Sequence, residues 1–386
     1  MFRAKPPLAE TYRGLHVLVT GHTGFKGSWL CLWLSELGAE VAGFSDHVPT
    51  EPSAFESFGA ASLRRDFRGD IRDAAAVAAA VEAWRPELIL HLAAQPIVRQ
   101  AMRDPLETFS ANILGTATVL EAARHEPSVR AVLVVTSDKV YANDDGGRSF
   151  DESDPLGGHE PYGVSKAAAE LVTSVYRSDR FHRGAASSNV PAVATARAGN
   201  VVGGGDWAAD RLIPDALRAI ASGQPMVIRS PRSTRPWQHV LEPLGGYLLH
   251  AQALLLDPAA APASLNFGPG DGAARTTGEV IARFLEAMAP WRTELVIDED
   301  STGSEAQTLQ VSSARARETL GWRPAWDYVE AIERIAEWHK AHLAGNADLH
   351  ELARRQLRAY CEASTVPQLA RQASQTANPM TFAEPT

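Results

Sequence analysis

The chain has 386 residues, enough to bury a large core and to form two or three domains. Hydrophobic residues make up 45% and charged residues 22% of it, which are ordinary values for a globular protein. The formal net charge of -9 argues against nucleic acid or an anionic membrane surface as the main partner. The N-terminal residues lack the apolar core of a signal peptide, and no apolar run reaches the ~18 residues of a membrane span, so we expect a cytoplasmic protein.

Two further classes are disfavoured by the positions of particular residue types. The two cysteines lie far apart and outside any CxxC pattern, which argues against a disulfide framework. The histidines lack the spacing of metal ligands, so we predict no metal site.

Short apolar runs alternate with helical patterns through the first half of the chain. Repeated strand–helix units of this length predict an α/β fold with a Rossmann-type, doubly wound parallel sheet, whose ligand cleft lies at the carboxyl ends of the strands. The predicted strands are Leu15–Thr20, Glu40–Ser45, Leu88–Leu92, Ala131–Thr136 and Ala192–Arg197. The predicted helices are Phe25–Leu37, Ala74–Trp84, Pro105–Arg124 and Val164–Tyr176.

The pattern changes after Gly199, where helices such as Ile213–Ala221 and Pro243–Leu256 alternate with short strands and proline-rich turns. We therefore predict a dinucleotide-binding domain over residues 1–200. A smaller C-terminal substrate-binding lobe is expected mainly over residues 201–345, with segments that return to the first domain. Residues 346–386 are expected to form an amphipathic helix, Leu349–Glu362, and a mobile tail.

A glycine-rich turn follows the first predicted strand and opens the first long helix. Gly21, Gly24 and Gly27 are spaced GxxGxxG, a departure from the commoner GxGxxG. Glycines let backbone N–H groups approach a pyrophosphate, and the helix amino terminus adds partial positive charge. The turn therefore predicts a dinucleotide site.

Three weaker signals extend this site along the neighbouring strand ends. Asp46 follows the second strand, where an acid could bind the adenosine ribose and favour NAD over NADP, although a solvated loop aspartate is an equal alternative. Asp70 and Ile71 could meet the adenine edge. The small residues Ala93 and Ala94, followed by Gln95, would let the cofactor pass close to the backbone.

Tyr162 and Lys166 are spaced i, i+4 at the start of a predicted helix, so they share one face. An ammonium beside a phenol should lower the pKa of the phenol, which could then take a proton from a sugar hydroxyl. Ser137, Asp138 and Lys139 follow the Ala131–Thr136 strand and would lie where the nicotinamide sits.

With these residues, the chain resembles the extended short-chain dehydrogenase/reductases, and among them the nucleotide-sugar 4,6-dehydratases that act on CDP-glucose. The resemblance spans about two-thirds of the chain, in the stretches GHTGFKGSWL, HLAAQP, TSDKVYAN, PYGVSKAAAELV, RAGNVVGGGDWAADRLIPD, RPWQHVLEPLGGYL and NFGP. It implies NAD as cofactor, oxidation at sugar carbon 4, loss of water across carbons 5 and 6, and return of the hydride to carbon 6.

The resemblance also implies a role for each catalytic residue. Tyr162 is the base for oxidation, Lys166 holds it and the nicotinamide ribose, and Ser137 hydrogen-bonds the carbon 4 oxygen. Asp138 is the acid for water loss, which requires a raised pKa. We hypothesise that Lys139 is desolvated, partly neutral and removes the carbon 5 proton; a structural salt bridge to Asp138 is the alternative.

Binding residues are expected on both sides of the cleft. A guanidinium such as that of Arg235 suits a diphosphate, and the indole of Trp237 can stack on a nucleobase. Gln307 and Thr308 depart from the family pattern, which leaves fine sugar specificity open. The expected cofactor contacts are Gly21, Thr23, Gly24, Phe25, Lys26, Gly27, Asp46, Asp70, Ile71, Ala93, Ala94, Gln95, Asn112, Thr136, Tyr162 and Lys166. The expected substrate contacts are Gln95, Ser137, Arg197, Asn200, Asp206, Trp207, Leu212, Ile213, Arg235, Trp237 and His239.

Other functions on the same scaffold stay open. A UDP- or dTDP-sugar 4,6-dehydratase or a 4-epimerase would use the same tyrosine and lysine, although an epimerase needs no acid such as Asp138. A non-catalytic dinucleotide-binding regulator is disfavoured because Tyr162 and Lys166 are both present. As in the family, we expect a homodimer or homotetramer in which Pro105–Arg124 and Val164–Tyr176 pair across a two-fold axis.

Overall fold

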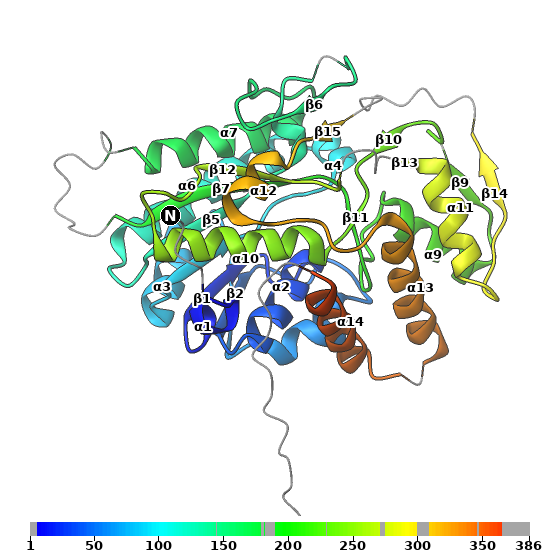
Figure 1. The fold of residues 1–386 in the computed structure, drawn as a ribbon, viewed down its shortest axis with the longest axis horizontal. Helices are drawn as coiled ribbons and strands as arrows, with labels where there is room; N and C mark the ends of the chain where they lie inside the picture. Colours follow the sequence, from blue (N-terminus) through cyan, green and yellow to red (C-terminus); the bar gives the residue numbers. More distant parts are fainter. Residues whose placement is uncertain are drawn as a thin grey trace, which may run out of the picture.

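The computed structural model describes residues 6–143, 145–178, 181, 190–228, 230–270, 275–298, 309–345 and 347–364. Within them, seven parallel strands form one sheet in the order β3-β2-β1-β4-β5-β7-β12 (Figure 1). The strand order reverses between β1 and β4, which confirms the predicted doubly wound sheet. The strands are β1 His16–Thr20, β2 Glu40–Ser45, β3 Arg65–Arg68, β4 Leu88–His91, β5 Ala131–Val135, β7 Ala192–Ala198 and β12 Ser264–Phe267.

Helices cover both faces of this sheet. On one face lie α3 (Ala74–Trp84), α6 (Gly115–His125) and α7 (Pro161–Tyr176), with a core that includes Leu18, Val77 and Val132. The other face carries α2 (Phe25–Glu36), α10 (Leu241–Leu256) and α12 (Ala314–Leu320). The strands of the sheet centre are buried on both faces, so they are continuous apolar runs without alternation.

The predicted helix Pro105–Arg124 is not a uniform α-helix. It consists of α5 (Pro105–Phe109), a π-helical turn η3 (Ser110–Leu114) and α6, and it follows a short helix α4 (Val98–Arg103) that the sequence pattern did not indicate. A Cβ at Gly115 would lie 2.7 Å from Ile71 Cγ2, so the chain passes very close to the loop after β3 here. The predicted helix over Pro105–Arg124 is therefore present, with a π-helical turn in its middle that the sequence pattern did not indicate.

The second lobe packs beside the carboxyl ends of the strands (Figure 1). Its core joins α9, α11, α13 and β9 through residues such as Leu217, Phe284 and Ile335. Its elements are α9 Leu212–Ser222, β9 Met226–Ile228, β10 Thr234–Arg235, β13 Arg275–Thr276, α11 Thr277–Ala287, β14 Leu295–Ile297 and α13 Tyr328–Ala344.

Parts of the chain beyond residue 200 lie in the first lobe. Helix α10 packs on β5 and β7, and β12 pairs in parallel with β7 at the edge of the sheet. Shorter elements complete the description: α1 Leu8–Tyr12, η1 Phe55–Gly59, η2 Ala60–Ser62, η4 Asp138–Val140, β6 Ser149–Phe150, β8 Val201–Val202, β11 Gln238–His239 and β15 Gln310–Val311. The domain boundaries themselves stay a prediction.

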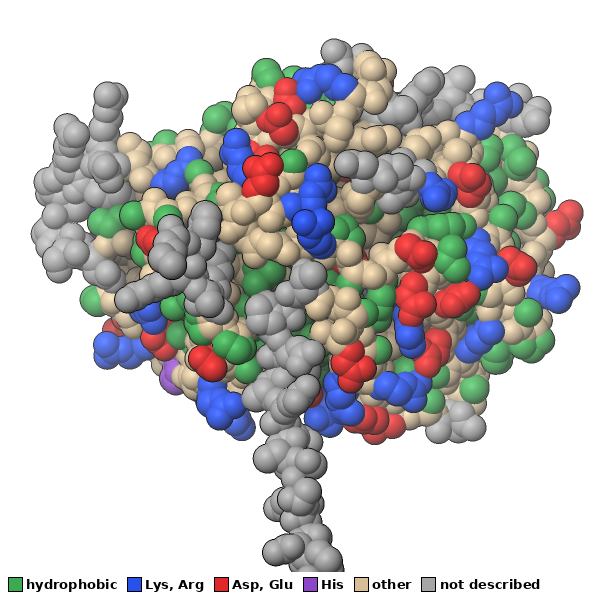
Figure 2. All heavy atoms as spheres, in the orientation of Figure 1, with side chains coloured by type: hydrophobic (Ala, Val, Ile, Leu, Met, Phe, Trp, Pro, Cys, Tyr) green, Lys and Arg blue, Asp and Glu red, His purple; other side chains and the backbone are tan. Residues whose placement is uncertain are grey.

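The C-terminal helix α14 (Leu349–Ala363) buries Leu357 and Tyr360 against the first lobe, beside Trp33 of α2. Acidic and basic side chains lie interspersed over α13 and α14 in Figure 2, where i, i+3 and i, i+4 ion pairs form. Both cysteines are buried and free. The predicted mobile tail lies outside the described residues, and within the described chain no helix is long and apolar enough to cross a membrane.

Candidate active site

A cavity of about 950 Å³ lies between the carboxyl ends of the strands and the second lobe. This volume falls within the range of small-molecule sites. It is lined by most of the residues expected to bind a cofactor or substrate: Gly21, Thr23, Gly24, Phe25, Lys26, Gly27, Asp46, Asp70, Ile71, Ala93, Ala94, Gln95, Thr136, Ser137, Asp138, Lys139, Tyr162, Lys166, Asn200, Asp206, Leu212, Ile213, Arg235 and Trp237.

The glycine turn forms a close approach between three backbone segments. Gly21 has a φ of +74°, and a Cβ there would lie 2.7 Å from the backbone nitrogen of Ala93. A Cβ at Gly27 would lie 2.2 Å from the Gly21 carbonyl oxygen, so neither position accepts a side chain. Helix α2 begins at Phe25 with no side-chain hydrogen bond at its N-cap, Gly24, so its first N–H groups suit an anionic ligand.

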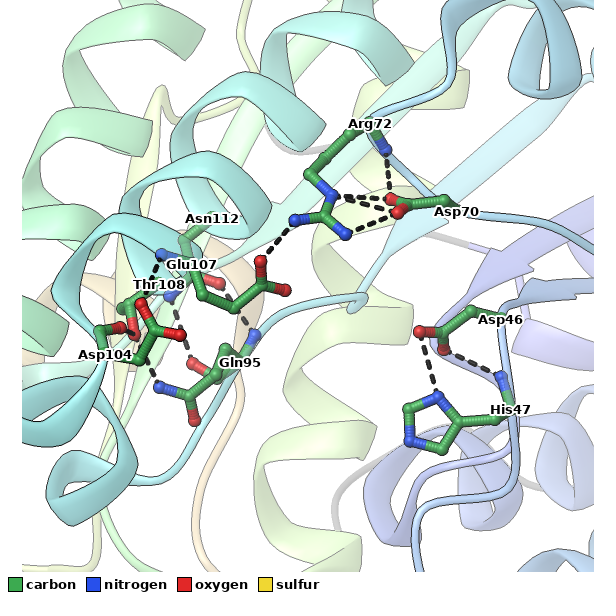
Figure 3. A network of polar contacts seen from close by, with 9 residues as sticks. All are labelled: Asp46, His47, Asp70, Arg72, Gln95, Asp104, Glu107, Thr108 and Asn112. Carbon is green, nitrogen blue, oxygen red and sulfur yellow. Dashed lines mark hydrogen bonds and ion pairs between the residues drawn. The ribbon is translucent and has the colours of Figure 1, made fainter.

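Two acidic residues, Asp46 and Asp70, also line the cavity (Figure 3). Asp46 follows β2, is exposed, and contacts His47 through the backbone N–H (2.8 Å) and Nδ1 (2.9 Å). Asp70 is held by Arg72, whose Nε lies 2.9 Å from Oδ1, and this hydrogen bond lowers the pKa of Asp70. Arg72 also pairs with Glu107 of α5, so it ties the loop after β3 to the neighbouring helix.

Asn112 is an expected cofactor ligand that does not line the cavity. It is buried at the π-helical turn, accepts a hydrogen bond from the Gln95 N–H (2.8 Å), and donates to Ser165 Oγ (2.8 Å) (Figure 3). Gln95 in turn donates from Nε2 to Thr108 (2.8 Å). Asn112 therefore supports the loop after β4 from behind, and the expectation of direct contact is not met.

The expected catalytic side chains converge on one wall of the cavity. Ser137 Oγ donates to Asp138 Oδ1 at 3.0 Å and also hydrogen-bonds Tyr162. Tyr162 lies in the first turn of α7, whose N-cap residue Glu160 accepts the backbone N–H groups of Tyr162 (2.7 Å) and Gly163 (2.9 Å). Lys166 lies one turn further on and donates from Nζ to the carbonyl of Val135, the last residue of β5 (3.1 Å).

The electrostatics of this wall agree with the sequence-based expectation for Asp138 and contradict it for Tyr162. Burial raises the pKa of Asp138, as expected, against the opposing effects of Lys139, Ser137, Arg235 and Lys26. Burial also raises the pKa of Tyr162 to about 12, despite the hydrogen bond with Ser137 and the charge of Arg211. The predicted lowering of the phenol pKa is therefore wrong, because desolvation outweighs the positive charge around it.

Lysines surround the same wall. Burial lowers the pKa of Lys166 to about 8, and the negative charge of Glu170 opposes this shift. Burial lowers the pKa of Lys26 to about 7, and its ammonium group donates to the Tyr247 hydroxyl at 3.3 Å. Lys139 is half-buried, and its positive charge opposes the rise in the pKa of Asp138, although the two side chains form no ion pair within the described residues.

The opposite wall comes from the second lobe. Asp206 is buried and pairs with Arg211 at 3.2 Å, while Leu212 and Ile213 begin α9 beside them. Trp237 is 8% exposed, and its indole nitrogen has no hydrogen-bond partner among the described residues. A buried, unpaired N–H at the edge of a cavity suits a polar ligand atom.

Three expected substrate residues lie away from the cavity. Arg197 is buried in β7 and pairs with Glu170. His239 is fully buried and packs against Trp29 and Trp326, with ring centroids 5.9 and 4.9 Å apart. Trp207 packs on α13. The structure does not bring these side chains to the cavity, because Arg197 is held by Glu170 and the rings of His239 and Trp207 pack against other aromatic side chains.

Arg72 and Arg211 line the cavity and were missed. Arg72 directly follows Asp70 and Ile71, and Arg211 directly precedes the helix that begins at Leu212. A positive charge at the junction of a loop and a helix was the signal that could have identified them. Within the described residues, no group of three or more His, Cys, Asp or Glu side chains is arranged to hold a metal ion. Gln307 and Thr308 lie outside the described residues.

Comparisons with known proteins define the family. The model of the GDP-mannose 4,6-dehydratase family matches residues 18–335, and the chain belongs to this family. The chain is 42% identical, over 92% of its length and 98% of the relative, to CDP-glucose 4,6-dehydratase of Salmonella typhimurium. It is 28% identical, over 85% of its length and 94% of the relative, to dTDP-glucose 4,6-dehydratase of Streptomyces griseus.

Solved structures share the fold. MoeE5 in complex with UDP-glucose and NAD is 26% identical, with a TM-score of 0.69 over 85% of this chain and 99% of that chain. The UDP-glucose 4-epimerase of Thermus thermophilus in complex with NAD is 25% identical, with a TM-score of 0.68 over 83% of this chain and 98% of that chain.

Proposed function

We propose that this protein is an NAD-dependent CDP-glucose 4,6-dehydratase, a hydro-lyase that converts CDP-glucose to CDP-4-keto-6-deoxyglucose for deoxysugar synthesis. The observation that carries the proposal is the convergence of the Tyr162 phenol, the Ser137 hydroxyl and the buried Asp138 carboxyl on one cavity wall. The identity of 42% with the Salmonella typhimurium enzyme supports the choice of reaction and nucleotide.

The cavity residues fit a dinucleotide. The side-chain-free positions Gly21 and Gly27 and the uncapped start of α2 would hold the pyrophosphate, and Asp46 the adenosine ribose. NAD-bound structures at 25% and 26% identity support NAD as the cofactor. When bound, NAD would supply the hydride acceptor needed at sugar carbon 4 and the hydride donor needed at carbon 6.

We assign proton removal from the carbon 4 hydroxyl to Tyr162, with Ser137 hydrogen-bonding the same oxygen. Because a pKa of about 12 disfavours phenolate, this base needs neighbouring positive charge. Arg211 supplies part of that charge from the second lobe, and Lys166 carries a second one on the same face of α7. Closing the second lobe over the wall would also exclude water from the proton transfer.

Water loss is assigned to Asp138 and Lys139. A carbonyl at carbon 4 acidifies the carbon 5 hydrogen, and the carbon 6 hydroxyl is a poor leaving group that needs a proton. Asp138 can hold that proton because burial raises its pKa. We assign removal of the carbon 5 proton to Lys139, and exchange of that hydrogen with solvent at an unchanged rate in Lys139→Ala would contradict the assignment.

The nucleotide is assigned to the second-lobe wall. Trp237 offers an apolar face and an unpaired N–H, and Arg235, which is 6% exposed, brings a guanidinium to the same wall. An indole stacks on a base, and a guanidinium pairs with phosphate oxygens.

We also propose that the protein is a homodimer, or a tetramer built from such dimers, through α5, η3 and α7. Large apolar side chains are exposed along these helices, with Leu106 78%, Leu114 54% and Leu171 59% exposed. A two-fold axis would bury this surface against its own copy. Light scattering should then give at least twice the chain mass, and Leu106→Asp with Leu171→Asp should give the monomer; a monomeric native chain would contradict the proposal.

A panel of CDP-glucose, UDP-glucose, dTDP-glucose and UDP-N-acetylglucosamine tests the function. We expect a keto-deoxy product from CDP-glucose with the highest kcat/KM and no net change of NAD. A 4-epimer without water loss would favour an epimerase, and tight NAD binding with no product from any of the four would favour a regulator.

A further inference from the structure

A buried polar chain runs directly behind the catalytic wall. Glu170 and Arg197 lie on α7 and β7 with side chains 4% exposed, and their charged groups meet in a two-point contact (Nε–Oε1 2.9 Å, Nη2–Oε2 2.8 Å). The third guanidinium nitrogen donates to the Tyr141 hydroxyl at 2.8 Å, which donates to Asn266 Oδ1 at 2.7 Å. This row of polar contacts thus joins the carboxyl ends of β7 and β12.

The same carboxylate fixes the strand end that carries the catalytic residues. Glu170 Oε1 accepts a hydrogen bond from Thr136 Oγ1 at 2.5 Å, and Oε2 accepts one from Thr195 Oγ1 at 2.7 Å. Lys166 holds the preceding carbonyl, that of Val135. Val135 and Thr136 are therefore held by Lys166 and Glu170, which lie one helical turn apart on α7.

We propose that Glu170 is a positioning residue for the first hydride transfer: it fixes Thr136 at the end of β5 and supplies a negative charge one helical turn from the Lys166 ammonium, while Arg197 holds it in place. This inference rests on the proposed function. Neither Glu170 nor Arg197 lines the cavity, so their effect on the reaction is indirect, and we assign it to their contacts with Thr136 and Lys166.

The charge of Glu170 affects the pKa of Lys166, because among the described residues no other neighbouring group opposes the effect that burial has on that lysine. Burial lowers the pKa of Lys166 to about 8, and Glu170 is the neighbour that opposes the shift. Lys26 of α2 and His91 of β4 also interact electrostatically with Lys166, the first as a like charge and the second as a buried imidazole whose own pKa is lowered to about 3. Tyr162 shares its helix face.

The test uses Glu170→Gln and Thr136→Val in the full chain. A CDP-sugar without the carbon 6 hydroxyl, CDP-6-deoxyglucose, can be oxidised at carbon 4 but cannot lose water, so accumulated reduced nicotinamide reports the first step alone. We expect Glu170→Gln to slow this step roughly 10- to 100-fold with little change in KM, and to move the alkaline limit of its pH profile downward. Thr136→Val keeps the charge, so it should slow the step without moving that limit.

Glu242→Gln is the matched control. Glu242 is a fully buried carboxyl of α10 that accepts hydrogen bonds from Trp326 N (2.7 Å) and Tyr360 Oη (2.9 Å), away from the cavity. The substitution Glu242→Gln removes a buried carboxyl group that makes no hydrogen bond to β5. A wild-type rate and pH profile in folded Glu170→Gln, or the same pH shift in Glu242→Gln, would overturn the inference.

A readout without substrate separates this inference from the proposed function. The rate at which a small acylating reagent labels Lys166, followed against pH by peptide mass spectrometry, reports the neutral amine. Labelling should begin at lower pH in Glu170→Gln than in the wild type or Glu242→Gln, whichever nucleotide sugar is turned over. Identical labelling curves would contradict the role of Glu170; failure of CDP-glucose turnover alone would contradict only the proposed function.

Discussion

Two buried carboxyl groups flank the end of β5, and they differ in how they are satisfied. Glu170, behind the strand, accepts hydrogen bonds from Thr136, Thr195 and both sides of the Arg197 fork. Asp138, on the cavity side, accepts one from Ser137, and burial raises its pKa. The Glu170 carboxyl is therefore fixed by a guanidinium fork and two hydroxyls, whereas Asp138 lacks such a fork and its raised pKa suits proton exchange. We therefore expect Glu170 to hold the end of β5 in place and Asp138 to take part in proton transfer.

The cavity side gives the largest expected effect. Asp138→Asn removes the proton donor for water loss while keeping shape, so dehydration of CDP-glucose should fall by about 10²- to 10⁴-fold. Oxidation of CDP-6-deoxyglucose should persist within an order of magnitude. Rapid-quench product analysis measures the rate of dehydration, and nicotinamide absorbance measures the rate of oxidation. Equal losses in both rates would contradict a role of Asp138 specific to water loss.

On the rear side, Arg197→Met should affect folding before chemistry. It leaves the Glu170 carboxylate buried without its partner, a change that costs about 3–5 kcal/mol of unfolding free energy. Urea unfolding followed by circular dichroism measures this. The double variant Glu170→Gln, Arg197→Met should recover part of the loss, and additive losses would argue against direct coupling.

A third buried carboxyl group, that of Glu242, should make the stability of the protein depend on pH. Burial raises its pKa from 4.5 to about 7, so the folded state binds its proton more tightly than the unfolded state. Stability should therefore fall as pH rises from about 4.5 to 7, by about 3 kcal/mol from this group. Denaturant unfolding at several pH values should show that Glu242→Gln removes this slope; an unchanged slope would exclude Glu242 as its source.

The smallest effect is expected on the opposite wall. Trp237→Ala should raise KM for CDP-glucose about tenfold, as expected for loss of one base–aromatic contact. The affinity for NAD, measured by fluorescence titration, should stay the same because the expected dinucleotide contacts come from the glycine turn and strand ends of the first lobe, whereas Trp237 packs in the second-lobe core. A parallel loss of NAD affinity would place Trp237 in the wrong subsite.

Local pattern identified most of the first lobe. The runs at Val17–Thr20 and Val132–Val135 are buried on both faces, so apolarity alone identifies them as central strands. The i, i+4 spacing of Tyr162 and Lys166 fixes a shared helix face before any packing is known. The spacing of Gly21 and Gly27 similarly predicts a tight turn, and the short distances from added Cβ atoms to Ala93 and Gly21 confirm it. The contact with a pyrophosphate stays a prediction.

Long-range packing decided the remainder. Arg197 is a plausible ligand in sequence, but its fork meets Glu170 from a helix 27 residues earlier. The pKa of Tyr162 depends on the burial of its phenol, which no local spacing encodes. The return of β12 to the edge of the sheet likewise depends on pairing with β7 across more than sixty residues.

The sequence by itself therefore determined the α/β alternation, the glycine turn and the shared helix face of Tyr162 and Lys166, because these depend on backbone periods and on the absence of a side chain. Only the tertiary structure decided which buried charges are paired and which can exchange a proton. Those properties arise from desolvation and from contacts between residues far apart in the chain.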